Sequence, residues 1–184
     1  MLRFFTIFLI LNFYNPAFSS TKKNIISQMK HTDILSFKFI QTINKKKENG
    51  YCIIKYPKKI FCEYEGSNKK IFVSNGKSLV IKVRNTGSYY IYPLNKTPLE
   101  LLLDKEYLIS RMSTLSPRII DNKIVTFKIL KNDNIINIFF DKNNFNLMGW
   151  QTEDVYQNLT ITFISSIKIN EVIDEDIFRL PTRD

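Results

Sequence analysis

Apolar and polar residues alternate in short runs through most of the chain, which is the period of half-buried β-strands. The clearest runs predict two consecutive β-hairpins. The first pairs residues 51–55 with residues 60–64, and the second pairs residues 70–74 with residues 78–81. An Asn-Gly pair at 75–76 joins the arms of the second hairpin. It predicts a type I′ turn, because both central residues of that turn need positive φ.

Further strands are predicted on either side of the hairpins. Residues 37–41 precede them, before a charged turn at 44–49, and Pro93 ends a Tyr-rich strand at 89–92. The remainder predicts a β-meander, in which Asn- and Asp-rich turns separate the strands. These strands are expected at residues 123–130, 135–140, 145–153 and 159–169, with a short extended piece at 176–181.

Two short helices are predicted between the strands. Residues 21–33 form the first, because Ile25, Ile26 and Met29 make a narrow apolar stripe. The second begins at Thr97, which fits the N-cap of a capping box. Pro98 suits its first helical position, Glu100 completes the box, and the helix is apolar through Leu99, Leu101, Leu102 and Leu103. The stretch 107–117 remains ambiguous.

Short strands joined by tight turns predict a mainly β, α+β fold with one antiparallel sheet of about 9–11 strands. Such a sheet twists and curls, and two short helices would pack against its concave side. The chain has 15 Phe and 9 Tyr, which favours a hydrophobic cavity inside the curl. The five glycines fall at or beside predicted turns: Gly50, Gly66, Gly76, Gly87 and Gly149.

The N-terminus predicts a secretory signal peptide over residues 1–19. Arg3 supplies a positive charge, residues 4–13 are apolar, and residues 17–19 resemble a small-x-small cleavage site. The alternative is an uncleaved anchor, but the apolar run is short for a membrane span. No cysteine stands at the cleavage point, so we expect a released protein with one domain at 20–184.

The net charge of +10 raises the question of an anionic partner. The lysines are scattered, and no arginine-rich helix or aromatic-plus-basic RNA motif is present, so we expect no nucleic-acid partner. Weak attraction to an anionic membrane face remains open. His31 is the one histidine, and no nucleophile–base–acid set accompanies it. We therefore expect a protein that is not an enzyme, with no catalytic residues, no metal site and no cofactor.

Several short motifs, taken in order, resemble the periplasmic outer-membrane lipoprotein carrier family of LolA type. The strand motifs are Phe39-x-Gln41, Gly50-x-x-x-Ile54-Lys55-x-Pro57 with Ile60, Glu63 and Tyr64, and Val73-Ser74-Asn75-Gly76-Lys77-x-Leu79. The others are Thr97-Pro98-Leu99 with Leu102-Leu103, Leu147-x-x-Trp150-x-x-x-Asp154 and Phe178-x-x-Pro181.

This resemblance implies an unclosed antiparallel barrel with a lid of short helices over a hydrophobic cavity. It implies a monomeric periplasmic chaperone without a cofactor, whose cargo is the acyl chains of outer-membrane lipoproteins. The implied partners are an inner-membrane ATP-driven release complex and an outer-membrane lipoprotein receptor. The alternative is a lipid- or glycolipid-binding periplasmic sensor on the same fold.

The resemblance also suggests site residues. Five would line the cavity, although each is nearly as typical of ordinary core: Phe39, Ile54, Tyr64, Phe72 and Trp150. Six would belong to the lid, or else to plain core: Ile25, Ile26, Met29, Leu99, Leu102 and Leu103.

Two details of the first hairpin complete the picture. The family usually has Arg before the hairpin proline, where it is thought to hold the lid. Here that position is Tyr56, so the holding role would fall to Tyr56 or to the adjacent Lys55. Cys52 and Cys62 lie on opposite arms in one register and form a candidate disulfide, or are two small apolar fillers.

Overall fold

The computed structural model describes residues 16–66, 69–131, 134–153 and 159–183. Its strands form one 11-stranded sheet in which neighbouring strands run antiparallel. The strands are β1 (Ile34–Ile43), β2 (Lys46–Lys55), β3 (Lys59–Tyr64), β4 (Lys70–Asn75), β5 (Ser78–Val83), β6 (Ser88–Pro93), β7 (Arg118–Ile120), β8 (Ile124–Lys131), β9 (Asn134–Asp141), β10 (Leu147–Glu153) and β11 (Leu159–Ile169).

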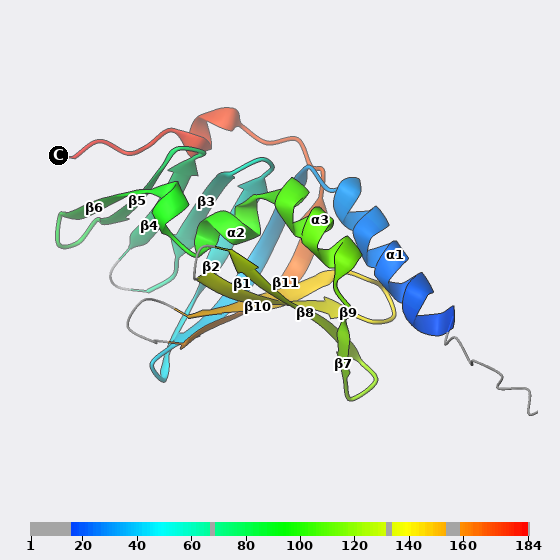
Figure 1. Ribbon diagram of the computed structural model, residues 1–184. Coiled ribbons are helices and arrows are strands. Elements are labelled where there is room, and N and C mark those ends of the chain that lie inside the picture. Colours follow the sequence, from blue (N-terminus) through cyan, green and yellow to red (C-terminus); the bar gives the residue numbers. More distant parts are fainter. Residues whose placement is uncertain (1–15, 67–68, 132–133, 154–158, 184) are drawn as a thin grey trace, which may run out of the picture.

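The spatial order of the strands is β6-β5-β4-β3-β2-β1-β11-β10-β9-β8-β7. Pairing of β1 with β11 joins the N-terminal and C-terminal halves of the sheet. Strands β6 and β7 are its two edges, and the sheet curls without closing (Figure 1). This arrangement confirms the predicted fold class, an unclosed antiparallel barrel that is mainly β.

Helices lie together over the concave face of the sheet (Figure 1). They are α1 (Pro16–Lys30), α2 (Leu99–Leu103) and α3 (Lys105–Thr114), with short 3-10 helices η1 (Leu94–Lys96) and η2 (Glu175–Phe178). Buried side chains of these three α-helices join the inward-facing strand residues in one core. Ile25 of α1, Leu101 of α2 and Leu108 of α3 are each no more than 1% exposed.

Two lysines tie α1 to α3. Lys22 of α1 donates to the carbonyl oxygens of Ser113 and Leu115, at 3.0 and 3.2 Å. Lys105 of α3 lies 2.8 Å from the Asp33 carboxylate, just beyond the other end of α1. The hydrogen bond and the charge of Lys105 lower the pKa of Asp33. The two helices are therefore fastened at both ends.

The register of the first hairpin agrees with the sequence pattern. Cys52 lies opposite Cys62 and Ile54 opposite Ile60, as predicted. The second hairpin joins the two predicted strands, but its turn lies one residue later than predicted, so that Ser74 lies opposite Leu79. Asn75 ends β4, and Gly76 has φ +97°, which is the glycine position of a type II′ turn instead of type I′. The Asn75 side chain accepts from the backbone of the two residues after Gly76, so it closes the turn.

Element boundaries differ from prediction where long-range pairing extends a strand. The charged turn expected at 44–49 shrinks to two residues with positive φ, and residues 46–49 pair with β1. The first helix spans 16–30 instead of 21–33. Of the predicted signal peptide at 1–19, residues 1–15 lie outside the described residues and residues 16–19 begin α1. The ambiguous stretch 107–117 belongs mostly to α3, followed by the short strand β7, which was not predicted.

The predicted capping box at Thr97 is wrong. The Thr97 hydroxyl donates to the carbonyl oxygen of Leu94, at 2.8 Å, and α2 has no side-chain cap at its N-terminus. Because η1 immediately precedes Thr97, the carbonyl oxygen of Leu94 at its start lies within reach of the Thr97 hydroxyl and takes its hydrogen bond. The piece expected to be extended at 176–181 begins instead as the 3-10 helix η2, where Asp174 accepts from the amide of Asp176.

A second buried cluster lies on the convex face. Ile71, Val73 and Val80 point away from the main core and are buried, as is Phe178 of η2. Helix η2 lies against β3 and β4, so the C-terminal segment covers this part of the sheet. Strands β3–β5 are therefore apolar on both faces, and their concave face remains free to line an interior.

Gly50 and Gly149 lie inside strands β2 and β10, whereas the sequence placed them beside turns. A Cβ at position 50 would lie 2.2 Å from the carbonyl oxygen of Glu63 and 2.9 Å from the Phe39 ring. Phe39 and Tyr64 are the cross-strand partners of Gly50. The missing side chain therefore leaves the space in which the Phe39 ring packs.

Gly50→Ala tests this close approach. We expect the free energy of unfolding to fall by about 2–3 kcal/mol, because a backbone oxygen cannot move as a side-chain end can. Urea denaturation measures the loss. Gly87→Ala is the control: it has φ +65° and no atom within 4 Å of the added Cβ, so we expect about 1 kcal/mol. Equal losses would contradict the steric explanation.

Candidate functional site

A cavity of about 370 Å³ lies between the concave face of the sheet and the beginning of α2. For comparison, an engineered cavity of about 150 Å³ stays dry and binds benzene. Strands from both halves of the barrel contribute to the wall. The apolar lining consists of Phe39, Ile43, Ile60, Tyr64, Phe72, Leu79, Ile81, Pro98, Leu99, Leu102 and Trp150, together with the Cys52 and Cys62 side chains.

Four of the five residues predicted for the cavity border it: Phe39, Tyr64, Phe72 and Trp150. Phe39 and Tyr64 pack edge to face, with ring centroids 4.9 Å apart. Burial, with a smaller contribution from the charge of Glu48, raises the pKa of Tyr64. Ile54 is 0% exposed in the main core and does not line this cavity, because the helices cover its end of β2.

The residues predicted for the lid divide into two groups. Leu99 and Leu102 of α2 border the cavity, whereas Leu103 is 0% exposed in the core. On α1, Ile25 is fully buried, and Ile26 and Met29 pack partly buried against the core. Met29 and Leu102 both border a second cavity of about 30 Å³, which is the space of one water. Among the helices of the described part of the chain, α2 is therefore the one that roofs the large cavity.

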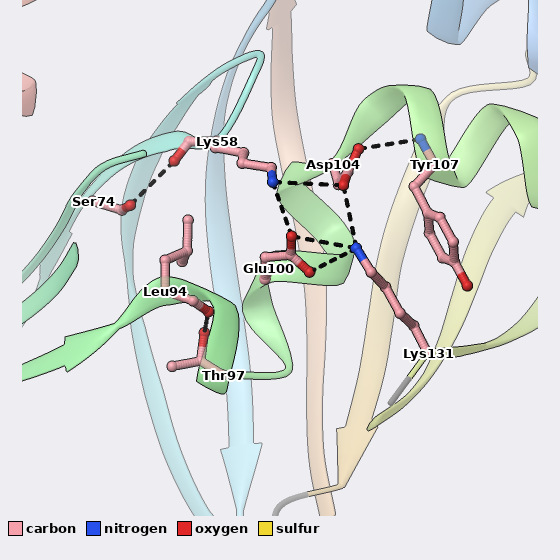
Figure 2. Close-up of polar contacts among 8 residues, drawn as sticks. All are labelled: Lys58, Ser74, Leu94, Thr97, Glu100, Asp104, Tyr107 and Lys131. Carbon is pink, nitrogen blue, oxygen red and sulfur yellow. Dashed lines mark hydrogen bonds and ion pairs between the residues drawn. The ribbon is translucent and has the colours of Figure 1, made fainter. Parts of the chain in front are cut away.

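Helix α2 is held by a cluster of four charged side chains (Figure 2). Lys58, in the turn between β2 and β3, lies 2.9 Å from the Glu100 carboxylate and 3.7 Å from Asp104. Lys131, at the end of β8, lies 3.0 Å from Glu100 and 3.4 Å from Asp104. The cluster thus joins α2 to both halves of the barrel.

Backbone contacts reinforce the cluster. The amide of Lys58 donates to the carbonyl oxygen of Leu103, at 3.0 Å, and the Lys58 carbonyl accepts from the Ser74 hydroxyl, at 3.1 Å. Asp104 also accepts from the amide of Tyr107, at 3.2 Å, so it caps α3 (Figure 2). Through these contacts, Lys58 and Asp104 fix the end of α2, the beginning of α3 and the turn of the first hairpin.

The charge on Lys131 stabilises this arrangement at neutral pH. Burial opposes the charge, but hydrogen bonds and attraction to Glu100 and Asp104 outweigh it and raise the pKa of Lys131. A lysine whose pKa is raised on folding stabilises the fold below its unfolded pKa. The contribution is lost only as the pH rises through the raised value, in the alkaline range.

Of the two residues expected to hold the lid, Tyr56 borders the small cavity beside Met29 and Leu102, and Lys55 points to the C-terminal segment. Lys55 pairs with Glu175 of η2. The Tyr56 amide donates to the Asp33 carbonyl oxygen, at 2.8 Å, and burial of its ring raises the pKa of the hydroxyl. In the described part of the chain, the ion pairs to α2 come from Lys58 and Lys131. The sequence pattern singles out neither lysine, although Lys58 lies in the predicted turn, two residues after Tyr56.

Cys52 and Cys62 form a disulfide across β2 and β3, with their Cα atoms 4.1 Å apart. Both residues are 4% exposed and border the cavity. The bond therefore joins two strands of the cavity wall.

Among the described residues, no group of His, Cys, Asp and Glu side chains could hold a metal ion. No helix in the same part of the chain is long and apolar enough to cross a membrane.

The amino-acid sequence matches one protein family. The family described as "Outer membrane lipoprotein carrier protein LolA" matches residues 30–181. No curated protein matches the chain significantly. An uncharacterized conserved protein from Thermus thermophilus has a similar structure, with 7% identity and a TM-score of 0.51 over 89% of this chain and 94% of that chain.

Two other solved structures show weaker similarity. A putative outer membrane lipoprotein-sorting protein domain from Vibrio parahaemolyticus is 8% identical, with a TM-score of 0.48 over 86% of this chain and 97% of that chain. MucB, in the Pseudomonas aeruginosa MucA/MucB complex, is 9% identical, with a TM-score of 0.48. That match covers 89% of this chain but only 61% of the MucB chain.

The fold and the cavity define a class of binding proteins built as an open β-barrel roofed by short helices. The family match is more specific than these structural similarities, which concern the fold alone. The chain belongs to the LolA family of outer membrane lipoprotein carrier proteins. Proteins of this family are periplasmic, and they bind or chaperone other molecules instead of catalysing reactions.

Glu100→Gln tests the attachment of α2. Glu100 is 8% exposed, and the substitution leaves two lysines facing a neutral amide. We expect α2 to loosen by about 1–3 kcal/mol. Hydrogen exchange at the amides of residues 101–103 should then accelerate by roughly 5- to 150-fold while the sheet amides keep their rates.

The matched control is Glu106→Gln. Glu106 is exposed on α3 and forms no ion pair with the described residues. We expect its exchange rates to equal those of the wild type. Equal acceleration throughout the sheet in Glu100→Gln would show that α2 is an integral part of the core.

Two measurements test the disulfide. Intact mass after thiol alkylation should show no free thiol without reductant and two with it. The bond encloses residues separated by 10 in sequence, for which chain entropy gives about 2–3 kcal/mol. The variant with both cysteines replaced by Ala should lose that much free energy of unfolding. Two free thiols in protein purified without reductant would refute the bond.

Proposed function

We propose that this protein is a periplasmic carrier that shields the acyl chains of lipoproteins between the inner and outer membranes. The observation that carries the proposal is the 370 Å³ cavity, walled by aromatic and aliphatic side chains inside a LolA-family barrel. Such a cavity takes an apolar ligand, because apolar surface transferred from water into it gains free energy. The cavity residues proposed to contact the cargo are Phe39, Tyr64, Phe72 and Trp150.

The energy scale of the cargo explains why the roof must move. Each buried methylene is worth about 0.8 kcal/mol, so one acyl chain is worth on the order of 10 kcal/mol. The ion pairs and hydrogen bonds of Glu100 that attach α2 are worth only a few kcal/mol. Bound acyl chains would therefore displace α2. During release, Leu99 and Leu102 of α2 would compete with the acyl chains for the apolar wall of the cavity.

The proposed route has three partners. An inner-membrane ATP-driven release complex supplies the lipoprotein, this protein carries it as a monomer, and an outer-membrane lipoprotein receptor accepts it. Residues 1–19 would direct export and then be removed. Nucleic acid is not a partner in this proposal.

A substitution inside the cavity tests ligand binding. Phe72→Glu places a carboxylate against the apolar wall, and burial of an unpaired charge is unfavourable. We expect a fluorescent fatty-acid analogue to bind the wild type at one site and to be displaced by a triacylated peptide. Phe72→Glu should weaken this binding at least about tenfold, since a buried unpaired polar group costs more than about 1.4 kcal/mol.

Phe163→Glu is the matched control, because Phe163 is 50% exposed on the convex face. We expect its affinity to equal that of the wild type. Equal losses in the two variants would argue against the cavity.

A transfer assay separates the carrier from a lipid-binding sensor. Mature protein is incubated with lipoprotein-loaded inner membranes and ATP, and the soluble fraction is examined for a one-to-one complex. A carrier yields that complex and passes the lipoprotein to receptor-bearing membranes. A sensor binds lipid but releases no lipoprotein from the membrane, and that result would reject the carrier proposal.

A further inference from the structure

The cavity changes from apolar to polar along the strands. Its apolar end, with Leu79, Leu99 and Leu102, lies beneath α2. On β1, the inward-facing positions then run from Phe39 to Gln41, toward the β1–β2 turn, which lies away from the helices (Figure 1). This other end is lined by hydrogen-bonding side chains: Gln41, Tyr64, Lys70, Thr152, Thr160 and Thr162.

Strand pairing brings these polar side chains together. Gln41 lies opposite Thr162 on β11, and the next inward position, Ile43, lies opposite Thr160. Thr160 in turn lies opposite Thr152 on β10. Positions two residues apart on a strand point to the same face, so the threonines form a hydroxyl-bearing patch beside Gln41. We call Gln41, Tyr64, Thr152, Thr160 and Thr162 the polar rim.

The Gln41 amide is held in place by two hydrogen bonds. The Tyr64 hydroxyl donates to its Oε1, at 3.2 Å, and its Nε2 donates to the Thr162 hydroxyl, at 3.1 Å. A side-chain amide has two N–H donors, so one donor of Gln41 remains. The Thr152 and Thr160 hydroxyls form no hydrogen bond with the described residues, and they provide further donors.

The charge at this end is already paired. Lys70 lies 2.6 Å from the Glu48 carboxylate, and its ammonium lies 3.7 Å from the centroid of the Tyr64 ring. Of the cavity-lining residues, Lys70 alone is charged. Pairing with Glu48 leaves little net charge for an anionic headgroup. The free groups of the rim are therefore neutral donors, which suit carbonyl oxygens.

We propose that the polar rim is a subsite for the ester and amide carbonyls that join acyl chains to a neutral lipid headgroup. This inference rests on the proposed acyl-binding function and adds a direction to it. The acyl chains extend toward α2, the carbonyls accept from Gln41, Thr152 and Thr160, and the headgroup remains at the end near the β1–β2 turn. The rim thereby selects a diacylglyceryl type of lipid over a bare alkyl chain and over an anionic phospholipid.

The test compares ligands that share chain length but differ in carbonyls. Displacement of the fluorescent fatty-acid analogue is measured with a diacylglycerol, with an alkane of the same chain length and with phosphatidylglycerol. Loss of one hydrogen bond weakens binding by about 2- to 13-fold. Gln41→Leu should weaken diacylglycerol binding by that factor and leave alkane binding unchanged.

Two further variants complete the test. Gln151→Leu is the control, because Gln151 lies opposite Ile161 on the convex side of the same sheet, and it should change neither affinity. Thr160→Val removes a rim hydroxyl without disturbing the Gln41 network, so it tests the rim even if Gln41→Leu folds poorly. We expect the same selective loss for diacylglycerol.

Each contrary result would overturn one part of the proposal. Equal losses for diacylglycerol and alkane, or no loss in either rim variant, would overturn the subsite while leaving the apolar cavity in place. Tighter binding of phosphatidylglycerol than of diacylglycerol to the wild type would overturn the neutral character of the rim. If no ligand binds the wild type, the proposed acyl-binding function itself fails.

Discussion

A sheet that curls but does not close has an apolar concave face that must be covered, and this requirement governs the rest of the structure. Edges β6 and β7 remain unpaired with each other, so the sheet cannot seal its own interior. Helices α1 and α3, tied together at both ends by lysines, cover one part of it. The other part is roofed by α2, a helix of only five residues, and a cavity remains beneath it.

Attachment of α2 differs in kind from that of its neighbours. Its leucines face the core and the cavity, but its position is set by Glu100 between two lysines from opposite halves of the barrel. A partly exposed ion cluster is worth a few kcal/mol, whereas an acyl chain is worth on the order of 10 kcal/mol. Under the proposed function, a roof held in this way would stay closed over an empty cavity and yield to an apolar ligand.

The wall of the cavity is held by contacts of other kinds than those that hold its roof. The disulfide joins β2 and β3 within the wall, and the C-terminal helix η2 covers the convex side of β3 and β4. Gly50 allows the Phe39 ring to pack against the strand beside it. In the proposed lipid subsite, these contacts would hold the donors of Gln41 and the threonines in place, as discrimination between similar lipids requires.

Local sequence determined much of this protein. Alternating residues and tight turns specified both hairpins, the register of the first one and the position of Cys52 opposite Cys62, because neighbouring residues make those contacts. The predicted cavity residues Phe39, Tyr64, Phe72 and Trp150 border the cavity for a related reason: strand alternation decides which side chains face inward.

Contacts between distant segments decided the rest. Glu100 suited a capping box with Thr97, yet it pairs with Lys58 and Lys131, which are 42 and 31 residues away in sequence. Thr97 is drawn to the Leu94 carbonyl, and residues 46–49 become strand by pairing with β1. A local pattern cannot contain these partners, because curling of the completed sheet is what brings the segments together.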